Sequence, residues 1–192
     1  IMDPHFSQAQ GYTDKIPCEI LHGTKIFQDS VPDLIKDHSV IMACDGGSQK
    51  IALSYIQKDG NLLFGQAIKT RSGHNKISKI ILALEKEDLI GESILLVDEM
   101  IDTAGTLIEI LKKLETKKPG QIDAAITHGI LSGEAINLIN NSSLKKVYVM
   151  DTVNVYEKNL SEKFIVVHSG YFFAEVIRRI HFKDSLSSLY NT

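Results

Sequence analysis

The most informative stretch of this sequence combines two acidic residues with a turn of small residues. The acids are Asp98 and Glu99, which directly follow the apolar run 94–97. The turn consists of Asp102, Thr103, Ala104, Gly105 and Thr106. It offers backbone N–H groups, hydroxyls and a glycine that allows close approach, at the start of a predicted helix. These features predict a cradle for a phosphate dianion.

The two acids need a role other than phosphate binding, because a carboxylate repels a phosphate. Accepting hydrogen bonds from sugar hydroxyls is the first interpretation of Asp98 and Glu99, and anchoring a divalent metal ion is the second. A simpler interpretation of the turn is that Asp102 or Thr103 only caps the helix. For Asp102 alone the two interpretations are equally good, whereas the whole arrangement favours a phosphate site.

Apolar runs rich in Val and Ile alternate with amphipathic patterns along the chain. Six of these runs predict buried strands, at 40–43, 62–64, 94–97, 124–126, 147–150 and 164–167. After the turn, apolar residues recur at helical spacing, namely Leu107, Ile110, Leu111 and Leu114. Shorter helices are predicted at 135–139 and 172–180. The alternation predicts an α/β fold with an open, mostly parallel sheet and helices on both faces.

The predicted turn lies where such folds bind ligands, outside the carboxyl ends of the strands. Asp45, Gly46 and Gly47 follow another buried strand, which suits a turn that lines the site or an ordinary strand-to-helix turn. The segment 69–79 combines four basic residues with little apolar content, and we expect it to be mobile. His128 also follows a strand, but it has no acid or cysteine partner for a catalytic triad, so we interpret it as structural.

The composition narrows the possible functions. The chain has 192 residues and a formal net charge of -3 at pH 7, so we expect one domain without a general nucleic-acid surface. Its two cysteines, Cys18 and Cys44, lack the spacing of a zinc site or a disulfide scaffold. No apolar run approaches the roughly 20 residues that span a bilayer, and the start lacks a secretory signal. We therefore expect a cytoplasmic protein that binds neither membranes nor nucleic acids.

Several segments resemble one family. Residues 97–106 resemble the phosphoribosyl-pyrophosphate loop of the type I phosphoribosyltransferase fold, in the form found in ribose-phosphate pyrophosphokinases. Further resemblances to that family lie at 3–12, 127–135, 174–181 and 185–190. Together they cover nearly the whole chain but only the second half of a full-length synthetase. This implies that 1–23 is the end of a missing N-terminal domain and that 24–192 is a phosphoribosyltransferase-like C-terminal domain.

The resemblance implies a reaction and a ribose 5-phosphate site. Family members transfer the diphosphoryl group of ATP to the C1 hydroxyl of ribose 5-phosphate, with Mg²⁺ as cofactor. Carried over to this chain, the turn at 102–106 binds the 5-phosphate, and Asp98 and Glu99 bind the ribose hydroxyls. Family members usually carry two aspartates here, so Glu99 keeps the charge but reaches one methylene farther.

The resemblance also implies metal ligands and catalytic cations. His5 and Asp45 match the histidine and the aspartate that ligate Mg²⁺ beside the ATP phosphates. Lys69 and Arg71 match the start of the family's flexible catalytic loop. Two cations there would stabilise the charge that develops on the transferred group. On the residues alone, the same basic run would be interpreted as a solvated loop.

Three functions remain open. The leading hypothesis is the C-terminal part of a ribose-phosphate pyrophosphokinase, a homo-oligomer (dimer or hexamer) when complete. The 192-residue chain alone is then expected to be weak or inactive. A phosphoribosyltransferase that uses the product shares the loop, but the segments 127–135 and 174–181 do not point there. A non-catalytic regulatory subunit would keep the fold, yet such partners typically lose the cations that Lys69 and Arg71 retain.

Overall fold

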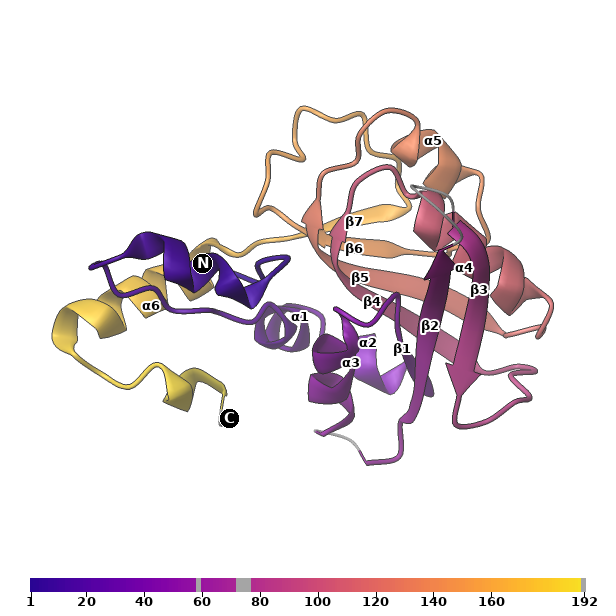
Figure 1. The fold of residues 1–192 in the computed structure, drawn as a ribbon, viewed down its shortest axis with the longest axis horizontal. Coiled ribbons are helices and arrows are strands. Elements are labelled where there is room, and N and C mark those ends of the chain that lie inside the picture. The colour runs from indigo at the N-terminus through magenta and orange to yellow at the C-terminus, as the bar shows by residue number, and fades with distance from the viewer. Residues whose placement is uncertain (58–59, 72–76, 191–192) are drawn as a thin grey trace.

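One sheet forms the centre of the computed structural model, which describes residues 1–57, 60–71 and 77–190 (Figure 1). Its seven described strands lie in the order β3-β2-β1-β4-β5-β6-β7. They are β1 (Val40–Ala43), β2 (Leu63–Arg71), β3 (Ile77–Leu84), β4 (Ser93–Ile101), β5 (Gln121–Gly129), β6 (Val147–Met150) and β7 (Phe164–Val167). Neighbouring strands are parallel except β2 and β3, which pair antiparallel. The predicted open, mostly parallel sheet is therefore confirmed.

Helices cover both faces of this sheet (Figure 1). One face carries α4 (Gly105–Glu115) and α5 (Ala135–Asn140). The opposite face carries α1 (Thr24–Ser30), α2 (Asp33–Lys36), α3 (Gln49–Ile56) and α6 (Gly170–Phe182). Two short 3-10 helices, η1 (Ser7–Thr13) and η2 (Ser187–Tyr190), lie near the chain ends. The arrangement matches the predicted α/β class.

β4 shows why the central strands are apolar throughout. Ile94 and Leu96 belong to the core beneath α4, whereas Leu95 and Val97 belong to the core on the opposite face. All four side chains are fully buried. A strand covered on both faces needs an apolar residue at every position, so its sequence is a continuous apolar run.

The region around β2 and β3 differs from the expectation. β2 continues to Arg71 and β3 returns beside it, so 69–71 and 77–79 form paired strands instead of a loop. The rest of the expected mobile segment, 72–76, lies outside the described residues. β3 was not predicted, although 80–84 are continuously apolar, because its start lies in the segment interpreted as a mobile loop. It is an edge strand, in which Ile80 is buried but Ile81 is 43% exposed.

The N-terminal segment and the C-terminal helix lie on the same face of the sheet as α1 (Figure 1). Met2 and Leu21 form a parallel bridge and are buried in the same core as Val176 of α6. The assignment of 1–23 to a separate domain stays a prediction. Among the helices described, none combines the length and the apolar character that crossing a membrane requires.

Candidate active site at the carboxyl edge of the sheet

The predicted phosphate loop joins the end of β4 to the start of α4. Ala104 precedes the helix in a left-handed conformation, with a φ of 63°. This conformation costs an alanine roughly 1–2 kcal/mol, so neighbouring structure must hold it. The loop after β5 contributes, because Leu131 N donates to Ile101 O at 3.1 Å. One residue further along, Ser132 N donates to Asp102 O at 3.0 Å.

Asp102 and Thr103 do not cap α4. The residue that precedes the helix is Ala104, and no side-chain hydrogen bond caps the helix there. A Cβ placed on Gly105 would meet only Thr103 Oγ1, 3.9 Å away, so there is room beside the backbone of the turn. The interpretation of Asp102 or Thr103 as a simple helix cap is therefore wrong, and the exposed side chain of Asp102 is available for another contact.

Three carboxylates meet beside this loop. Asp45, Asp98 and Glu99 each place an oxygen within 4.8 Å of the others. Glu99 is buried, and its Oε1 lies 2.8 Å from His5 Nδ1. Burial, the contact with Glu99 and the charge of Asp45 together raise the pKa of Asp98 far above its ordinary value. Carboxylate oxygens gathered in this way suit a hard divalent cation.

Asp45 is fixed by the turn between β1 and α3. Its Oδ1 accepts hydrogen bonds from Gly47 N at 2.8 Å and from Ser48 N at 3.2 Å. Its Oδ2 accepts from Lys69 Nζ at 3.3 Å. Burial alone would raise the pKa of Asp45, but Lys69 and the backbone N–H groups outweigh it and lower that pKa. The turn therefore both leads into α3 and places an ionised carboxylate in the site.

The two predicted catalytic cations belong to β2. Lys69 lies within the strand, and its contact with Asp45 brings a positive charge to the carboxylates. Arg71 is the last residue of β2 and pairs with Ile77 across the hairpin. The side chain of Arg71 lies outside the described part of the structure, so its role stays a prediction.

A cavity of about 190 Å³ gathers these groups. It is lined by His5, Asp45, Lys69, Asp98, Glu99, Met100, Ile101, Asp102, Thr103, Ala104, Gly105, Thr106 and Leu107. The structure thus brings together the residues nominated from the sequence, apart from the Arg71 side chain, while their individual roles stay predictions. Sequence reasoning missed Met100 and Ile101 at the end of β4 and Leu107 in the first turn of α4, because an apolar residue carries no signal of a ligand.

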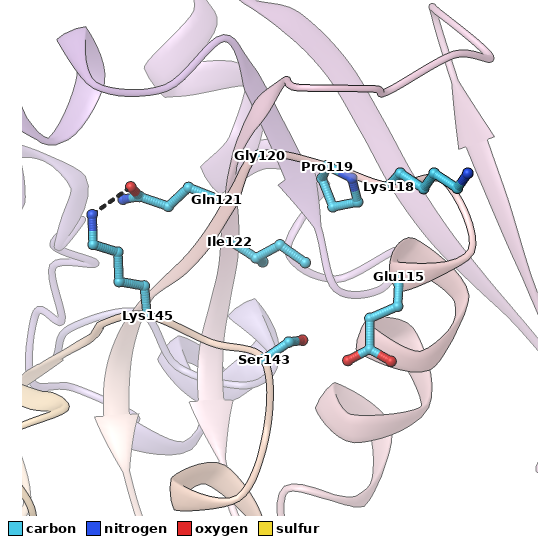
Figure 2. A pocket seen from close by; sticks show the side chains of 8 residues that line it. All are labelled: Glu115, Lys118, Pro119, Gly120, Gln121, Ile122, Ser143 and Lys145. Carbon is cyan, nitrogen blue, oxygen red and sulfur yellow. Dashed lines mark hydrogen bonds between the residues drawn. The ribbon is translucent and has the colours of Figure 1, made fainter.

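A larger cavity, of about 340 Å³, lies at the opposite edge of the sheet (Figure 2). It is lined by Glu115, Lys118, Pro119, Gly120, Gln121, Ile122, Ser143 and Lys145. Lys145 Nζ already donates to Gln121 Oε1 at 2.7 Å. The candidate residues from the sequence lie at the carboxyl edge, where open α/β sheets bind their ligands. We therefore assign the site to the smaller cavity.

The sequence of the chain is similar to those of several known proteins. A family model described as a phosphoribosyl synthetase-associated domain matches residues 74–191. A ribose-phosphate pyrophosphokinase from Chlorobaculum tepidum is 34% identical over 100% of this chain and 58% of its own length. Ribose-phosphate pyrophosphokinase A from Dictyostelium discoideum is 34% identical over 99% of this chain and 59% of its own length. The chain thus spans somewhat more than half the length of these curated relatives.

Solved structures agree on the fold. A phosphoribosylpyrophosphate synthetase from Mycobacterium smegmatis superposes with a TM-score of 0.81, at 23% identity, over 95% of this chain and 58% of that one. An orotate phosphoribosyltransferase from Aeropyrum pernix superposes with a TM-score of 0.52, at 13% identity, over 80% of this chain and 73% of that one. At these identities the likeness concerns the fold alone, and it confirms the predicted type I phosphoribosyltransferase-like architecture.

Proposed function

Because the chain belongs to the phosphoribosyl synthetase family, we propose that it is the ribose 5-phosphate-binding part of a ribose-phosphate pyrophosphokinase. The reaction moves the diphosphoryl group of ATP to the C1 hydroxyl of ribose 5-phosphate and releases AMP. The observation that carries the proposal is a single cavity that holds a phosphate-type turn, three carboxylates and a lysine.

Ribose 5-phosphate fits the turn and the acids in one orientation. The N–H groups at 103–106 and the positive end of the α4 dipole attract the 5-phosphate. Asp98 and Glu99 then accept hydrogen bonds from the ribose hydroxyls, which separates both carboxylates from the phosphate. The sugar ring is thereby held from two sides, and its C1 hydroxyl is free to react.

Mg²⁺ fits the donor set of the cavity. Hard cations prefer carboxylate oxygens, and Mg²⁺ keeps several waters, so a few protein ligands suffice. The raised pKa of Asp98 reflects its burial first and the neighbouring carboxylates second, and a bound cation would favour the ionised form against both. His5 and Asp45 would hold the ion, with Glu99 beside them. When bound, Mg²⁺ neutralises charge on the ATP phosphates.

Lys69 acts on the group in transfer. The C1 hydroxyl oxygen attacks the β-phosphorus of ATP and gives up its proton to solvent. The bond from that phosphorus to the bridging oxygen of the α-phosphate breaks, and AMP leaves. Such a displacement asks the protein mainly to align the reactants and to neutralise charge. Lys69 supplies a positive charge there, and Arg71 would add a forked donor. The contact of 3.3 Å with Asp45 keeps the ammonium of Lys69 in the cavity.

We propose the complete activity for a protein as long as the curated relatives, of which this chain spans about 58%. The 192-residue chain alone is expected to bind ribose 5-phosphate and to turn over weakly. We further propose that the complete enzyme is cytoplasmic and a homo-oligomer, either a dimer or a hexamer.

One observation favours a second candidate, a non-catalytic regulatory subunit of the same synthetase. Glu99 stands where family members usually carry an aspartate, and its Oε1 is bonded to His5 Nδ1. If this pair persisted in the presence of metal and ATP, that nitrogen would be unavailable to the ion. The presence of Lys69 in the cavity favours the enzyme.

ATP labelled with ³²P in its β-phosphate distinguishes the two candidates. The full-length parent is incubated with labelled ATP, ribose 5-phosphate and Mg²⁺, and the products are separated by chromatography. Label in 5-phosphoribosyl 1-diphosphate supports the enzyme. Label that stays in ATP, in a sample that binds ribose 5-phosphate, supports the regulatory subunit. Failure to bind ribose 5-phosphate contradicts both, and an Asp102→Ala control shows whether any binding occurs at the turn.

A further inference from the structure

Few contacts of its side chain hold His5 in place. The side chain is 59% exposed, so packing does not fix its orientation. Its contacts are the bond of 2.8 Å to Glu99 Oε1 and an edge-on contact with the ring of Phe6, which is itself exposed. The position of His5 therefore depends on the backbone of residues 2–5.

Asp3 anchors that backbone. Its side chain is buried, and Oδ2 accepts hydrogen bonds from Thr127 Oγ1 at 2.8 Å and from Gly23 N at 2.9 Å. Its φ is 32°, which is unfavourable for a residue with a side chain, and Pro4 further restricts the residue that precedes it. Such a conformation persists only where the surroundings hold it.

His128, near the end of β5, holds the same backbone. Its Nε2 lies 3.1 Å from Met2 O and 3.1 Å from Asp3 O. Because carbonyl oxygens only accept hydrogen bonds, Nε2 carries the proton and donates to them. Its Nδ1 lies 2.7 Å from Thr152 Oγ1, which orients the ring. We call Asp3, Thr127 and His128 the N-terminal clamp.

Two further residues make the clamp effective. A Cβ on Gly23 would lie 2.9 Å from Asp3 Oδ2 and 3.0 Å from Thr127 Oγ1, so only glycine lets these groups meet. Pro4 connects the clamp to His5, and its ring fixes φ near −65°. A shift of Asp3 is therefore passed on to His5 rather than absorbed between them.

We propose that Asp3 and His128 are positioning residues for His5, because they hold residues 2–5 against the end of β5 so that His5 reaches the metal ion beside Asp45. This inference rests on the metal role of His5 in the proposed function. The hydrogen bonds of the clamp reach the backbone of this segment and neighbouring polar groups. His128 also pairs with Met100 of β4 in the sheet, so only a double variant with His5 shows whether an effect on metal binding passes through the position of His5.

Binding of Mn²⁺ to the full 192-residue chain, measured by electron paramagnetic resonance without substrates, tests the inference. His5→Ala removes the ligand and sets the reference loss of affinity. His128→Leu removes the donor and should weaken Mn²⁺ binding about tenfold, as is typical of groups that orient a ligand. The double variant should lose no more than His5→Ala alone. His128→Gln keeps an N–H donor and should restore most of the affinity.

Ser169→Ala is the matched control. It removes a hydrogen bond of 2.7 Å to Asp151 Oδ1, close to the end of a neighbouring strand, and should leave the Mn²⁺ affinity unchanged. If His128→Leu does not fold, Thr127→Val serves in its place. It removes one hydrogen bond to Asp3 with little change in volume, and should weaken Mn²⁺ binding about threefold.

The outcomes separate this inference from the proposed function. A folded His128→Leu chain that binds Mn²⁺ as tightly as the wild type overturns the inference, and so does a double variant whose loss equals the sum of the single losses. Unchanged affinity in His5→Ala overturns the metal role of His5 and the inference with it. If the full-length parent transfers no diphosphoryl group although His5 and His128 are coupled, the proposed function fails and the positioning role stands.

Discussion

Asp98 and Asp123 stand on adjacent strands at opposite edges of the sheet, in opposite surroundings. Asp123, near the start of β5, is 1% exposed, and its oxygens are well partnered. Its Oδ1 accepts from Lys146 N at 2.9 Å, and its Oδ2 accepts from Gln121 Nε2 at 2.7 Å. Asp98, near the end of β4, instead lies beside two other carboxylates. Asp123 is therefore surrounded by donors, whereas Asp98, whose Oδ1 accepts from Glu99 N at 3.0 Å, otherwise faces carboxylates.

The pKa values of the two acids express this difference. Burial alone would raise the pKa of both. At Asp123, His38 and Gln121 outweigh burial and lower the pKa. At Asp98, Glu99 adds to burial and raises the pKa. A strongly raised pKa in a cleft is typical of a functional site, whereas a paired buried acid is typical of structural support.

The two cavities differ in the same way as the two acids, in how well their charged groups are paired. The cavity at the amino edge is the larger, but its Lys145 and Gln121 bond to each other (Figure 2). Gln121 also donates to Asp123. The smaller cavity at the carboxyl edge holds three carboxylates and, among its lining residues, a single lysine, Lys69. Unbalanced charge, and not volume, marks the binding edge of this sheet.

Asp123→Asn should have the largest effect on stability. It leaves His38, whose Nε2 lies 3.2 Å from Asp123 Oδ2, without its charged partner in a buried position. We expect a loss of about 3 kcal/mol in the free energy of unfolding, measured with urea. The affinity of the folded chain for ribose 5-phosphate should not change. A loss below about 1 kcal/mol would remove the contrast with Asp98.

The same variant has a defined pH dependence. Because the folded pKa of Asp123 is lowered, its contribution is fully present above the unfolded value of 3.8 and is lost as pH falls through the folded value. The stability gap between wild type and Asp123→Asn should therefore shrink below pH 3.8 in acid titrations of unfolding. A gap that stayed constant down to pH 2 would show that charge is not its origin.

Lys69→Ala tests the carboxyl edge through the reaction. We expect kcat of the full-length parent to fall about a hundredfold, because the cation acts mainly in the transition state. The KM for ribose 5-phosphate should change less than about threefold. Lys86→Ala, which removes an exposed lysine beyond the other end of the hairpin, is the control and should leave kcat unchanged. Equal losses in kcat and in ribose 5-phosphate affinity would argue against the assigned role.

Asp98→Asn should shift stability in the direction opposite to Asp123→Asn. Because the raised pKa of Asp98 keeps this carboxyl protonated in the folded chain near neutral pH, folding must take up a proton there. Asparagine needs no such proton, so the substitution should stabilise the metal-free chain by about 1 kcal/mol or more. Binding of Mn²⁺ should weaken at the same time. Urea unfolding and Mn²⁺ titration on the same preparation check both signs. A destabilised variant would mean that the contacts of Asp98 in the folded chain stabilise it.

Lys145→Ala should have the smallest effect. Its Nζ contact with Gln121 is exposed, so the change in unfolding free energy should stay within about 0.5 kcal/mol. Binding of ribose 5-phosphate should be unaffected, as measured by calorimetry. A clear loss of ribose 5-phosphate affinity would give the larger cavity a role in substrate binding.

The carboxyl-edge site was largely predictable because most of its parts are contiguous. Asp98, Glu99 and the turn at 102–106 follow one apolar run, and the end of a buried strand is where a sheet of this class exposes its ligands. The fold class followed from the same apolar runs. The resemblance to a known family supplied His5, which no local pattern would have singled out, and the metal role of Asp45, whose position after a buried strand had suggested only a turn that lines the site.

Contacts between distant segments were beyond the reach of sequence reasoning. His5 and Glu99 are 94 residues apart, and the bond from Thr127 to Asp3 spans 124 residues. Neither pair has a local signal, since each depends on how the N-terminal segment crosses the sheet. The edge strand β3 was missed although 80–84 form a continuous apolar run, because this run directly follows the polar, basic segment 69–79 that was interpreted as a loop.

β4 ends in the acids of the site, and its alternate side chains pack into separate cores on the two faces of the sheet. Tilting or sliding this strand would open both cores at once. A cavity-forming substitution such as Leu95→Ala or Leu96→Ala, on either face, should therefore loosen Asp98 and Glu99 before the chain unfolds. The geometry of the site therefore depends on the packing on both faces of the sheet. A destabilising substitution far from the substrate should first appear as a lower kcat of the full-length parent.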